Sequence, residues 1–314
     1  MQFEWTVFFG DAADAEARVY VLARPIGDPA GAATVAVLDG LKITGRVEGP
    51  KCRYSHTLPA RIPVRHRGVR TNDGRNDLGC AELVGEAIVP DPNFWTPELP
   101  FLYRATVEVR RGDEVVAKYE QDFGIRPLGV RGKRLVFNGK TWVPRAVRRE
   151  VVVGEAPLEL WRETATVMVV DDPSDELCRE ASEIGVILFA KISVGVDAAT
   201  TCRRLGRFAA VAMVLLQSSH GDVPTDVTRN IIPAQLLEKR SAIMNLRSST
   251  RVAVFLHPAD GSPGFFGELE IDDRFLPGIV QRNATPRGLI EARAACDTLQ
   301  ADLASEGDIA GYIV

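Results

Sequence analysis

The sequence predicts an antiparallel β-sandwich followed by an α/β domain, with the change near residue 129. Up to about residue 128, short runs rich in β-branched and aromatic residues are broken by Gly, Pro and Asp. After residue 130, apolar runs alternate with helical patterns. A chain of 314 residues is long enough for two domains, because domains usually contain on the order of 100–200 residues.

Six strands are expected in the first domain. In the run 102–111, Tyr103, Ala105, Val107 and Val109 alternate with polar residues, which is typical of a strand with one buried face. The segment His66–Asp77 is rich in Arg, Gly and Asn, so we expect a solvated loop there, with an anion-binding patch as the alternative. The other expected strands cover residues 4–10, 17–25, 33–40, 81–90 and 114–124.

The second domain is expected to begin with a hairpin that turns at Asn138-Gly139, a dipeptide typical of a type I′ turn. Continuous apolar strands joined by helices indicate parallel pairing with both faces of the sheet covered. Strands are expected at 164–170, 186–192 and 209–219, helices at 174–185, 199–208 and 287–307, and further elements at 230–243, 251–261, 274–282 and 309–314.

Composition narrows the possible partners and compartments. The net charge of −4 gives no bulk field that favours nucleic acid or an anionic membrane. Five scattered cysteines indicate reduced thiols, and no basic leader or long apolar run is visible, so we expect a soluble, cytoplasmic protein. No metal-binding or nucleotide-binding motif is present, so no metal and no cofactor is expected.

Four motifs in order resemble glycoside hydrolase family 2, the group of β-galactosidases, β-mannosidases and β-glucuronidases. They are "FWTPELPFLY" (94–103), "FGIR" (123–126), "LVFNGK" (135–140) and "DPSDELC" with "EIGVIL" (172–188). The prolines of the first motif fix φ and would set the angle at which the next strand enters the sheet. The resemblance implies an immunoglobulin-like β-sandwich over 1–128 and an incomplete or shortened, degenerate (β/α) TIM-like barrel over 129–314.

The departures from the family pattern concern its chemistry. The family's Asn-Glu pair, which closes the fourth barrel strand and contains the general acid/base, falls on Ser218 and Ser219. The family's arginine after the second strand falls on Met168, and no strand ending in a nucleophilic glutamate is visible. Retaining hydrolysis needs two carboxylates about 5–5.5 Å apart. We therefore expect a non-catalytic relative that acts as a carbohydrate-binding or assembly module.

Two alternatives remain open. An active glycosidase on β-linked sugars would need relocated carboxylates, and a protein-interaction or structural protein would use the open side of an incomplete barrel, with a homodimer or protein partner covering that edge. Active sites of such barrels lie at the carboxyl ends of the strands. The catalytic candidates there are Glu150, Asp171 and Asp260, and the substrate-binding candidates are Arg149, Asp172, Lys191, Ser218, Ser219 and His257.

Simpler interpretations compete for several of these residues. Asp171 and Asp172 precede a helical run, so capping of that helix is the expected role. Ser219 and His220 are neighbours without a nucleophile-elbow motif, so a polar loop is expected there. Lys191 ends an apolar strand and is expected to extend into solvent.

Overall fold

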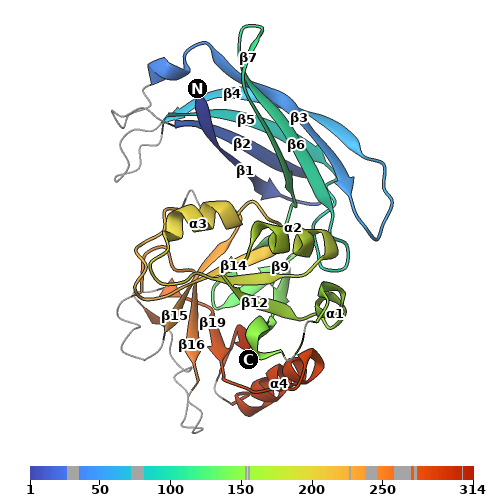
Figure 1. Cartoon of the computed structure of the whole chain (residues 1–314), viewed down its shortest axis with the longest axis vertical. Coiled ribbons are helices and arrows are strands. Elements are labelled where there is room, and N and C mark those ends of the chain that lie inside the picture. Colours follow the sequence, from blue (N-terminus) through green and yellow to red (C-terminus); the bar gives the residue numbers. More distant parts are fainter. Residues whose placement is uncertain are drawn as a thin grey trace. The chain divides into compact units, whose positions relative to one another are not determined.

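The structure is a computed structural model of the 314-residue chain. It describes residues 1–26, 35–71, 81–152, 154, 156–225, 228–237, 246–257, 270–271, 274–305 and 307–314. The chain divides into two compact units, and Figure 1 draws both. One contains residues 1–95 and 101–125, and the other contains residues 96–100 and 126–314.

The first unit is a sandwich of antiparallel strands paired in the order β1-β2-β5-β4-β3-β6-β7 (Figure 1). β4 belongs to both layers, since residues 60–64 pair with β3 and residues 65–71 pair with β5. The edge strands also meet, because Trp5 of β1 stacks on Tyr119 of β7 with ring centroids 5.1 Å apart. The strands are β1 Gln2–Ala12, β2 Glu16–Ile26, β3 Leu41–Lys51, β4 Ala60–Thr71, β5 Ala81–Pro90, β6 Leu102–Arg111 and β7 Glu114–Phe123.

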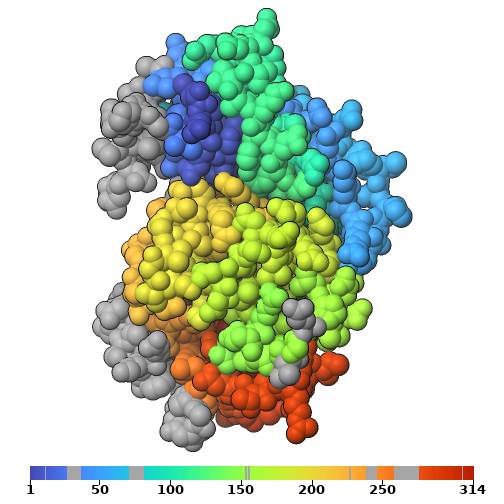
Figure 2. Space-filling view, viewed as in Figure 1, coloured from blue at the N-terminus to red at the C-terminus, as the bar shows by residue number. Residues whose placement is uncertain are grey.

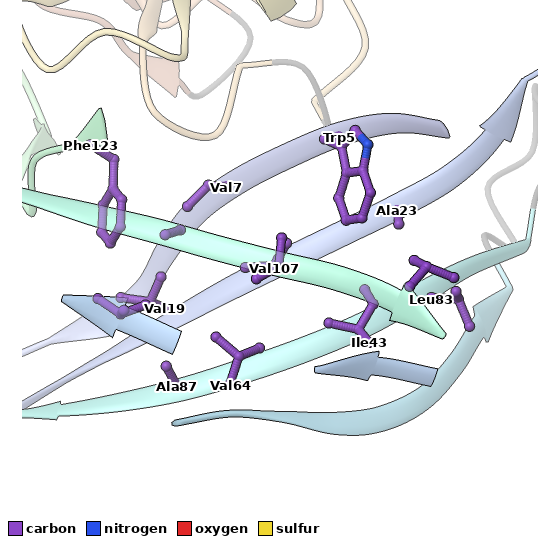
Figure 3. Close-up of a cluster of buried hydrophobic side chains, with 14 of the residues drawn as sticks. Trp5, Val7, Val19, Ala23, Ile43, Val64, Leu83, Ala87, Val107 and Phe123 are labelled. Atoms are coloured by element: carbon purple, nitrogen blue, oxygen red, sulfur yellow. The ribbon is translucent and has the colours of Figure 1, made fainter. Parts of the chain in front are cut away.

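The core of the sandwich lies between these layers. Figure 3 shows Val19, Ile43, Leu83, Val107 and Phe123 among its side chains, and all five are buried. The alternation expected in β6 is confirmed, because its inward residues are almost fully buried while the residues between them are more exposed. Burial of such side chains stabilises a fold by about 25 cal/mol per Å² of apolar surface.

Three expectations for this unit are corrected. The run 33–40 was expected to be a strand, but Val35–Leu38 form a 3-10 helix, η1. The sequence signals also missed β3. Residues 66–71 of the expected loop lie in β4, where Arg67 and Arg70 bind Glu86 and Glu82 of β5, so their charges are already partnered. The rest of that segment lies outside the described residues.

The proline-rich entry to β6 is held at its ends. Trp95 is fully buried, and its N–H donates to the carbonyl of Ile125 at 2.8 Å. The hydroxyl of Tyr103 accepts a hydrogen bond from the N–H of Asn93 at 2.8 Å. The motif therefore places the start of β6 in a defined position.

The second unit begins with a small antiparallel sheet, β8 Leu128–Arg131, β9 Arg134–Phe137 and β10 Lys140–Trp142. The expected hairpin is confirmed, and Asn138 and Gly139 both have positive φ as a type I′ turn requires. Trp142 continues from this hairpin towards the barrel, where its ring meets Phe189 edge to face at 6.2 Å between centroids.

Eight parallel strands then form a closed barrel. The first and last strands pair, with Ala146 opposite Ile313, so the ring has no open edge. The expectation of an incomplete barrel with an open side is therefore wrong, and the reason given for a partner at that edge disappears. The strands are β11 Arg145–Arg148, β12 Val167–Asp171, β13 Leu188–Lys191, β14 Val211–Leu216, β15 Ile232–Leu237, β16 Val252–Leu256, β19 Gly278–Gln281 and β20 Gly311–Ile313.

The barrel is shortened in its outer layer of helices. The described residues contain α-helices after the first, second, third and seventh strands, and none between β14 and β19. The helices are α1 Leu158–Glu163, α2 Asp175–Ile184, α3 Ala198–Leu205 and α4 Leu289–Asp302, with the 3-10 helix η2 at Arg149–Val151. The remaining short strands are β17 Glu270–Ile271 and β18 Arg274–Phe275.

Helix α4 covers the barrel with the face that its spacing predicts. Leu289, Ala292, Cys296 and Leu299 are buried, and the Cys296 thiol donates to the carbonyl of Ala146 at 3.4 Å. Helix α4, red in Figure 2, contacts β11 of the barrel. The helix therefore packs on the barrel.

Candidate functional site

A cavity of about 290 Å³ opens at the carboxyl ends of the barrel strands, and we call it the mouth cavity. This is the end of a TIM-like barrel at which active sites are built. Its polar lining comes from five strands or the residues just after them. The lining residues are Arg148, Val169, Asp171, Lys191, Leu215, Gln217, Ser218, Leu236, Leu237, Val254, Leu256 and Gln281.

Asp171 and Lys191 form an ion pair in this cavity. They are the last residues of β12 and β13 and lie opposite each other in the parallel register. The Nζ of Lys191 donates to Oδ2 of Asp171 at 2.8 Å, and both side chains remain partly exposed. Lys191 therefore does not simply extend into solvent as expected. The pair holds a carboxylate and an ammonium at a fixed place in the mouth.

The loop after β14 is held from two sides. The Nδ1 of His220 accepts a hydrogen bond from the N–H of Gln217 at 3.0 Å, and its Nε2 lies 3.1 Å from the carbonyl of Ser193. Since Nδ1 is an acceptor, Nε2 carries the proton. Arg247 donates to the carbonyls of Gln217 and Ser218 at 2.7 and 2.9 Å. Burial lowers the pKa of Arg247, and the nearby carboxylate of Asp222 opposes this effect.

These hydrogen bonds bear on whether Ser219 and His220 could act together as a nucleophile and its base. Both ring nitrogens of His220 are used by backbone groups, and Ser219 is exposed. The expected polar loop is confirmed. Ser218 lines the mouth cavity, whereas Ser219 is not among its lining residues.

The helix-capping interpretation of Asp171 and Asp172 is wrong. The N-cap of α2 is Ser174, whose hydroxyl accepts from the N–H of Leu177 at 3.2 Å. Oδ1 of Asp172 instead accepts from the N–H of Ser193 at 3.1 Å. Asp172 thus fixes the loop after β13 at Ser193, two residues beyond Lys191, where the strand ends.

The residues after the first strand differ from those expected. Arg148, the last residue of β11, lines the mouth cavity, while Arg149 and Glu150 belong to η2 and are exposed. Nη1 of Arg148 lies 3.7 Å from Oε1 of Glu150. Arg149, the expected binding residue, therefore lies outside the cavity lining, whereas its neighbour Arg148 lies in it.

The later strands bring an amide to the mouth. Gln281 ends β19 and lines the cavity beside Leu256 of β16, its partner in register. His257 is buried, and its N–H donates to the carbonyl of Gln281 at 2.7 Å. Asp260 lies outside the described residues. Among the described residues that line the cavity, Asp171 is the one carboxylate.

The structure brings together some of the predicted site residues. Asp171, Lys191 and Ser218 share the mouth cavity. Arg148, which ends β11 and lines the cavity, was not among the residues expected there. Its place at the carboxyl end of a barrel strand is the signal that could have identified it.

Two other features are absent from the described part of the chain. No group of three or more His, Cys, Asp and Glu side chains there could hold a metal ion. None of the described helices is long and apolar enough to cross a membrane.

Comparison with known proteins assigns part of the chain to a family. Residues 39–126 match the family model "Glycosyl hydrolases family 2". This stretch runs from before β3 to the residue that follows the sandwich unit. The family model therefore covers β3 to β7 of the sandwich, leaves out β1 and β2, and stops before the barrel.

Solved structures extend the likeness over almost the whole chain. A β-glucuronidase from Bacteroides uniformis matches with a TM-score of 0.57 at 14% identity, over 98% of this chain and 45% of its own. A putative β-galactosidase from Bacteroides fragilis matches with a TM-score of 0.57 at 12% identity, over 98% and 54%. A β-glucuronidase from Bifidobacterium dentium, complexed with coumarin-3-O-glucuronide, matches with a TM-score of 0.55 at 13% identity, over 95% and 56%. The chain spans about half the length of these proteins, and at this identity the likeness shows the fold.

Proposed function

The chain has the glycosyl hydrolase family 2 fold, a family 2 sandwich followed by a shortened barrel, and we propose that its barrel mouth binds a carbohydrate without cleaving it. One observation carries this proposal. The described lining of the mouth cavity has a single carboxylate, and Lys191 is paired with it at 2.8 Å.

The chemistry of glycoside hydrolysis explains why this matters. A retaining enzyme needs one carboxylate to attack the anomeric carbon and another carboxyl group to protonate the leaving oxygen. The fourth strand, β14, is followed by Gln217, Ser218 and Ser219, which have no acidic side chain. A serine hydroxyl cannot supply general acid catalysis, which typically contributes 10²–10⁴-fold in rate.

The same cavity has the properties of a sugar-binding site. Its volume lies near the lower end of the range for ligand pockets, about 300–1,000 Å³, which suits one sugar ring better than a chain of rings. Arg148, Gln217 and Gln281 offer donors and acceptors for hydroxyl groups. Leu256, which is 44% exposed, offers an apolar surface for the C–H face of a ring.

Calorimetric titration of the whole chain tests the binding. Glucuronic acid, galactose and mannose are the first probes, because the structural neighbours include proteins named β-glucuronidases and a putative β-galactosidase. Arg148→Gln is expected to weaken binding of the sugar that binds best by about tenfold, since a charged hydrogen bond contributes about 1.5–3 kcal/mol. Arg149→Gln is the matched control, because this neighbouring arginine is exposed outside the cavity lining, and it is expected to leave binding unchanged.

An assay with nitrophenyl glycosides tests the absence of hydrolysis. The chain is expected to release no nitrophenol from β-glucuronides, β-galactosides or β-mannosides above the rate in buffer. Release that is abolished by Asp171→Asn would overturn the proposal and establish an active glycosidase that uses this carboxylate. Absence of binding by all the sugars would leave the fold without a carbohydrate role.

A further inference from the structure

A second, larger cavity lies at the opposite end of the barrel. Its volume is about 710 Å³, and we call it the basal cavity. It is bordered by the residues at or before the starts of the first three strands, among them Pro144, Val167 and Ile187. The β9–β10 hairpin and residues Thr96–Glu98 of the proline-rich motif complete its wall. Since active sites of such barrels lie at the other end, the mouth chemistry does not account for this cavity.

One side of the basal cavity is aromatic. Phe137 and Trp142 line it, and their rings are tilted against each other with centroids 5.9 Å apart. Both side chains are only partly buried, so their outer surfaces face the cavity or solvent. Trp161 of α1 also lines the cavity but is 1% exposed and serves mainly as packing. A planar apolar group can therefore stack on the Phe137–Trp142 pair.

The other side carries positive charge. Arg145 of β11 and Arg293 of α4 both line the cavity and share one carboxylate, Asp297, at 3.2 and 2.6 Å. Burial alone would raise the pKa of Asp297, but hydrogen bonds from both arginines lower it below the usual value, so the carboxylate is ionised. Two guanidinium groups against one carboxylate leave an excess of one positive charge.

Within the described part of the chain, Arg293 has hydrogen-bond donors without an acceptor. Nη1 binds Asp297, and Nε is buried with no acceptor in the described part of the chain. Arg145 differs, since its nitrogens donate to Asp297, to the carbonyl of Val143 and to Gln300. Overall, four cationic side chains line the cavity against two carboxylates. The cations are Lys140, Arg145, Arg162 and Arg293, and the carboxylates are Glu98 and Glu163.

From this arrangement we propose that the basal cavity binds a small aromatic carboxylate, whose ring stacks on Phe137 and Trp142 and whose carboxylate accepts hydrogen bonds from Arg293. The volume lies within the range of about 300–1,000 Å³ in which small-molecule sites fall. The planar guanidinium matches a carboxylate in geometry, and ionised pairs are the stronger hydrogen bonds. The site is separate from the mouth cavity, so neither proposal depends on the other.

Titration of the whole chain with benzoate and with benzamide tests the charge requirement. The two probes have the same ring and nearly the same shape, but only benzoate is an anion. Benzoate is expected to bind at least tenfold more tightly, with weaker binding as salt is added. Equal affinities, or no binding of either probe, would overturn the proposal without any variant.

A matched pair of variants locates the binding. Arg293→Gln is expected to weaken benzoate binding about tenfold or more and to leave benzamide unaffected. Arg282→Gln is the control, because Arg282 forms a similar ion pair with Asp302 at 2.6 Å, has a similar exposure, and lines neither cavity. An equal effect of the two variants would show that benzoate responds to the net charge of the protein, which would overturn the assignment.

A third variant tests the aromatic side. Trp142→Leu is expected to weaken benzoate binding several-fold and to weaken cyclohexanecarboxylate less, because the aliphatic ring does not stack. Urea denaturation of the same samples reports whether the barrel remains folded. A variant that loses benzoate and stays folded confirms the basal site, and one that keeps benzoate contradicts it.

Discussion

The two ends of the barrel are built from the same strands but are held together differently. At the basal end, Arg126 is buried and donates to the carbonyls of Ala209, Val211 and Asn230. At the mouth, Asp171 and Lys191 face each other while both remain partly exposed to solvent. The Arg126 side chain is therefore shielded from solvent, whereas the Asp171–Lys191 pair is not.

This difference in burial determines how much stability is lost when a contact at either end is removed. A buried donor or acceptor that loses its partner costs about 1–3 kcal/mol, whereas an exposed ion pair contributes about 0–1 kcal/mol. Substitution of Arg126 should then affect stability first, and substitution of Asp171 or Lys191 should affect binding first.

The largest expected effect is at Arg126. Arg126→Leu removes three hydrogen bonds and leaves two buried carbonyls and one partly buried carbonyl without this donor, so we expect a loss of about 3–5 kcal/mol in the free energy of unfolding. Urea denaturation of the whole chain measures it. Arg162→Leu is the control, since Arg162 also donates to carbonyls, those of Pro97 and Glu98, but is less buried. A loss at Arg126 no greater than at Arg162 would contradict the contrast in burial.

A smaller loss is expected at Gly185, which ends α2 with φ of +95°. A Cβ at this position would lie 2.4 Å from the carbonyl oxygen of Pro97. Gly185→Ala is therefore expected to cost about 2–3 kcal/mol, of which about 1–2 kcal/mol is the left-handed backbone conformation. Thermal denaturation measures the change.

Gly132 provides the matched control for Gly185. It also has positive φ, +57°, but a Cβ there meets no atom within 4 Å. Gly132→Ala should show the cost of the backbone conformation alone, about 1–2 kcal/mol. If the two variants lose the same free energy of unfolding, the carbonyl of Pro97 does not crowd a Cβ at position 185 in solution.

The buried thiols predict how stability depends on pH. Burial raises the pKa of Cys202 from 9.0 to about 12. Between these values the unfolded chain releases the thiol proton and the folded chain keeps it, so stability falls as pH rises. Between pH 8 and pH 10 one such thiol contributes a loss of about 1 kcal/mol.

Urea denaturation in reducing buffer at pH 8 and pH 10 measures this loss. Cys202→Ala is expected to reduce the difference between the two pH values by about 1 kcal/mol relative to the unchanged chain. Cys52→Ala is the control, because Cys52 is not fully buried. An equal pH dependence in all three proteins would show that Cys202 is accessible to solvent in the folded state.

Local patterns predicted most elements but not the long-range contacts. The alternation in β6, the turn at Asn138-Gly139 and the face of α4 depend on neighbouring residues, and all three are confirmed. The run at η1 has the β-branched residues of a strand, and its 3-10 conformation is not encoded in that composition. The partners of Arg126 lie 83 to 104 positions away in the sequence, so no local pattern could reveal them.

The candidate site shows the same limit of local sequence patterns, here for single residues. Placing Ser218 after the fourth strand was correct, because β14 is a long apolar run whose end is clear. At the first strand, an error of one residue exchanged Arg149 for Arg148. Successive side chains of a strand point to opposite faces, so such an error changes which side chain enters the cavity.

The smallest effect on stability is expected at Lys191, and it tests the comparison of the two ends most directly. Lys191→Met removes the ion pair with Asp171, which should change the free energy of unfolding by less than about 1 kcal/mol, because both side chains are partly exposed. Arg204→Met is the control, since Arg204 and Asp175 form a pair of similar exposure outside the mouth cavity.

Both variants should therefore denature in urea almost as the unchanged chain does, while only Lys191→Met alters sugar binding in calorimetry. Without its partner, Asp171 presents an uncompensated negative charge in the mouth, so an acidic sugar should lose more affinity than a neutral one. If Lys191→Met destabilises the chain as much as Arg126→Leu, the mouth is as essential to the fold as the basal end. The contrast between the buried contacts of Arg126 and the exposed ion pair in the mouth is then wrong.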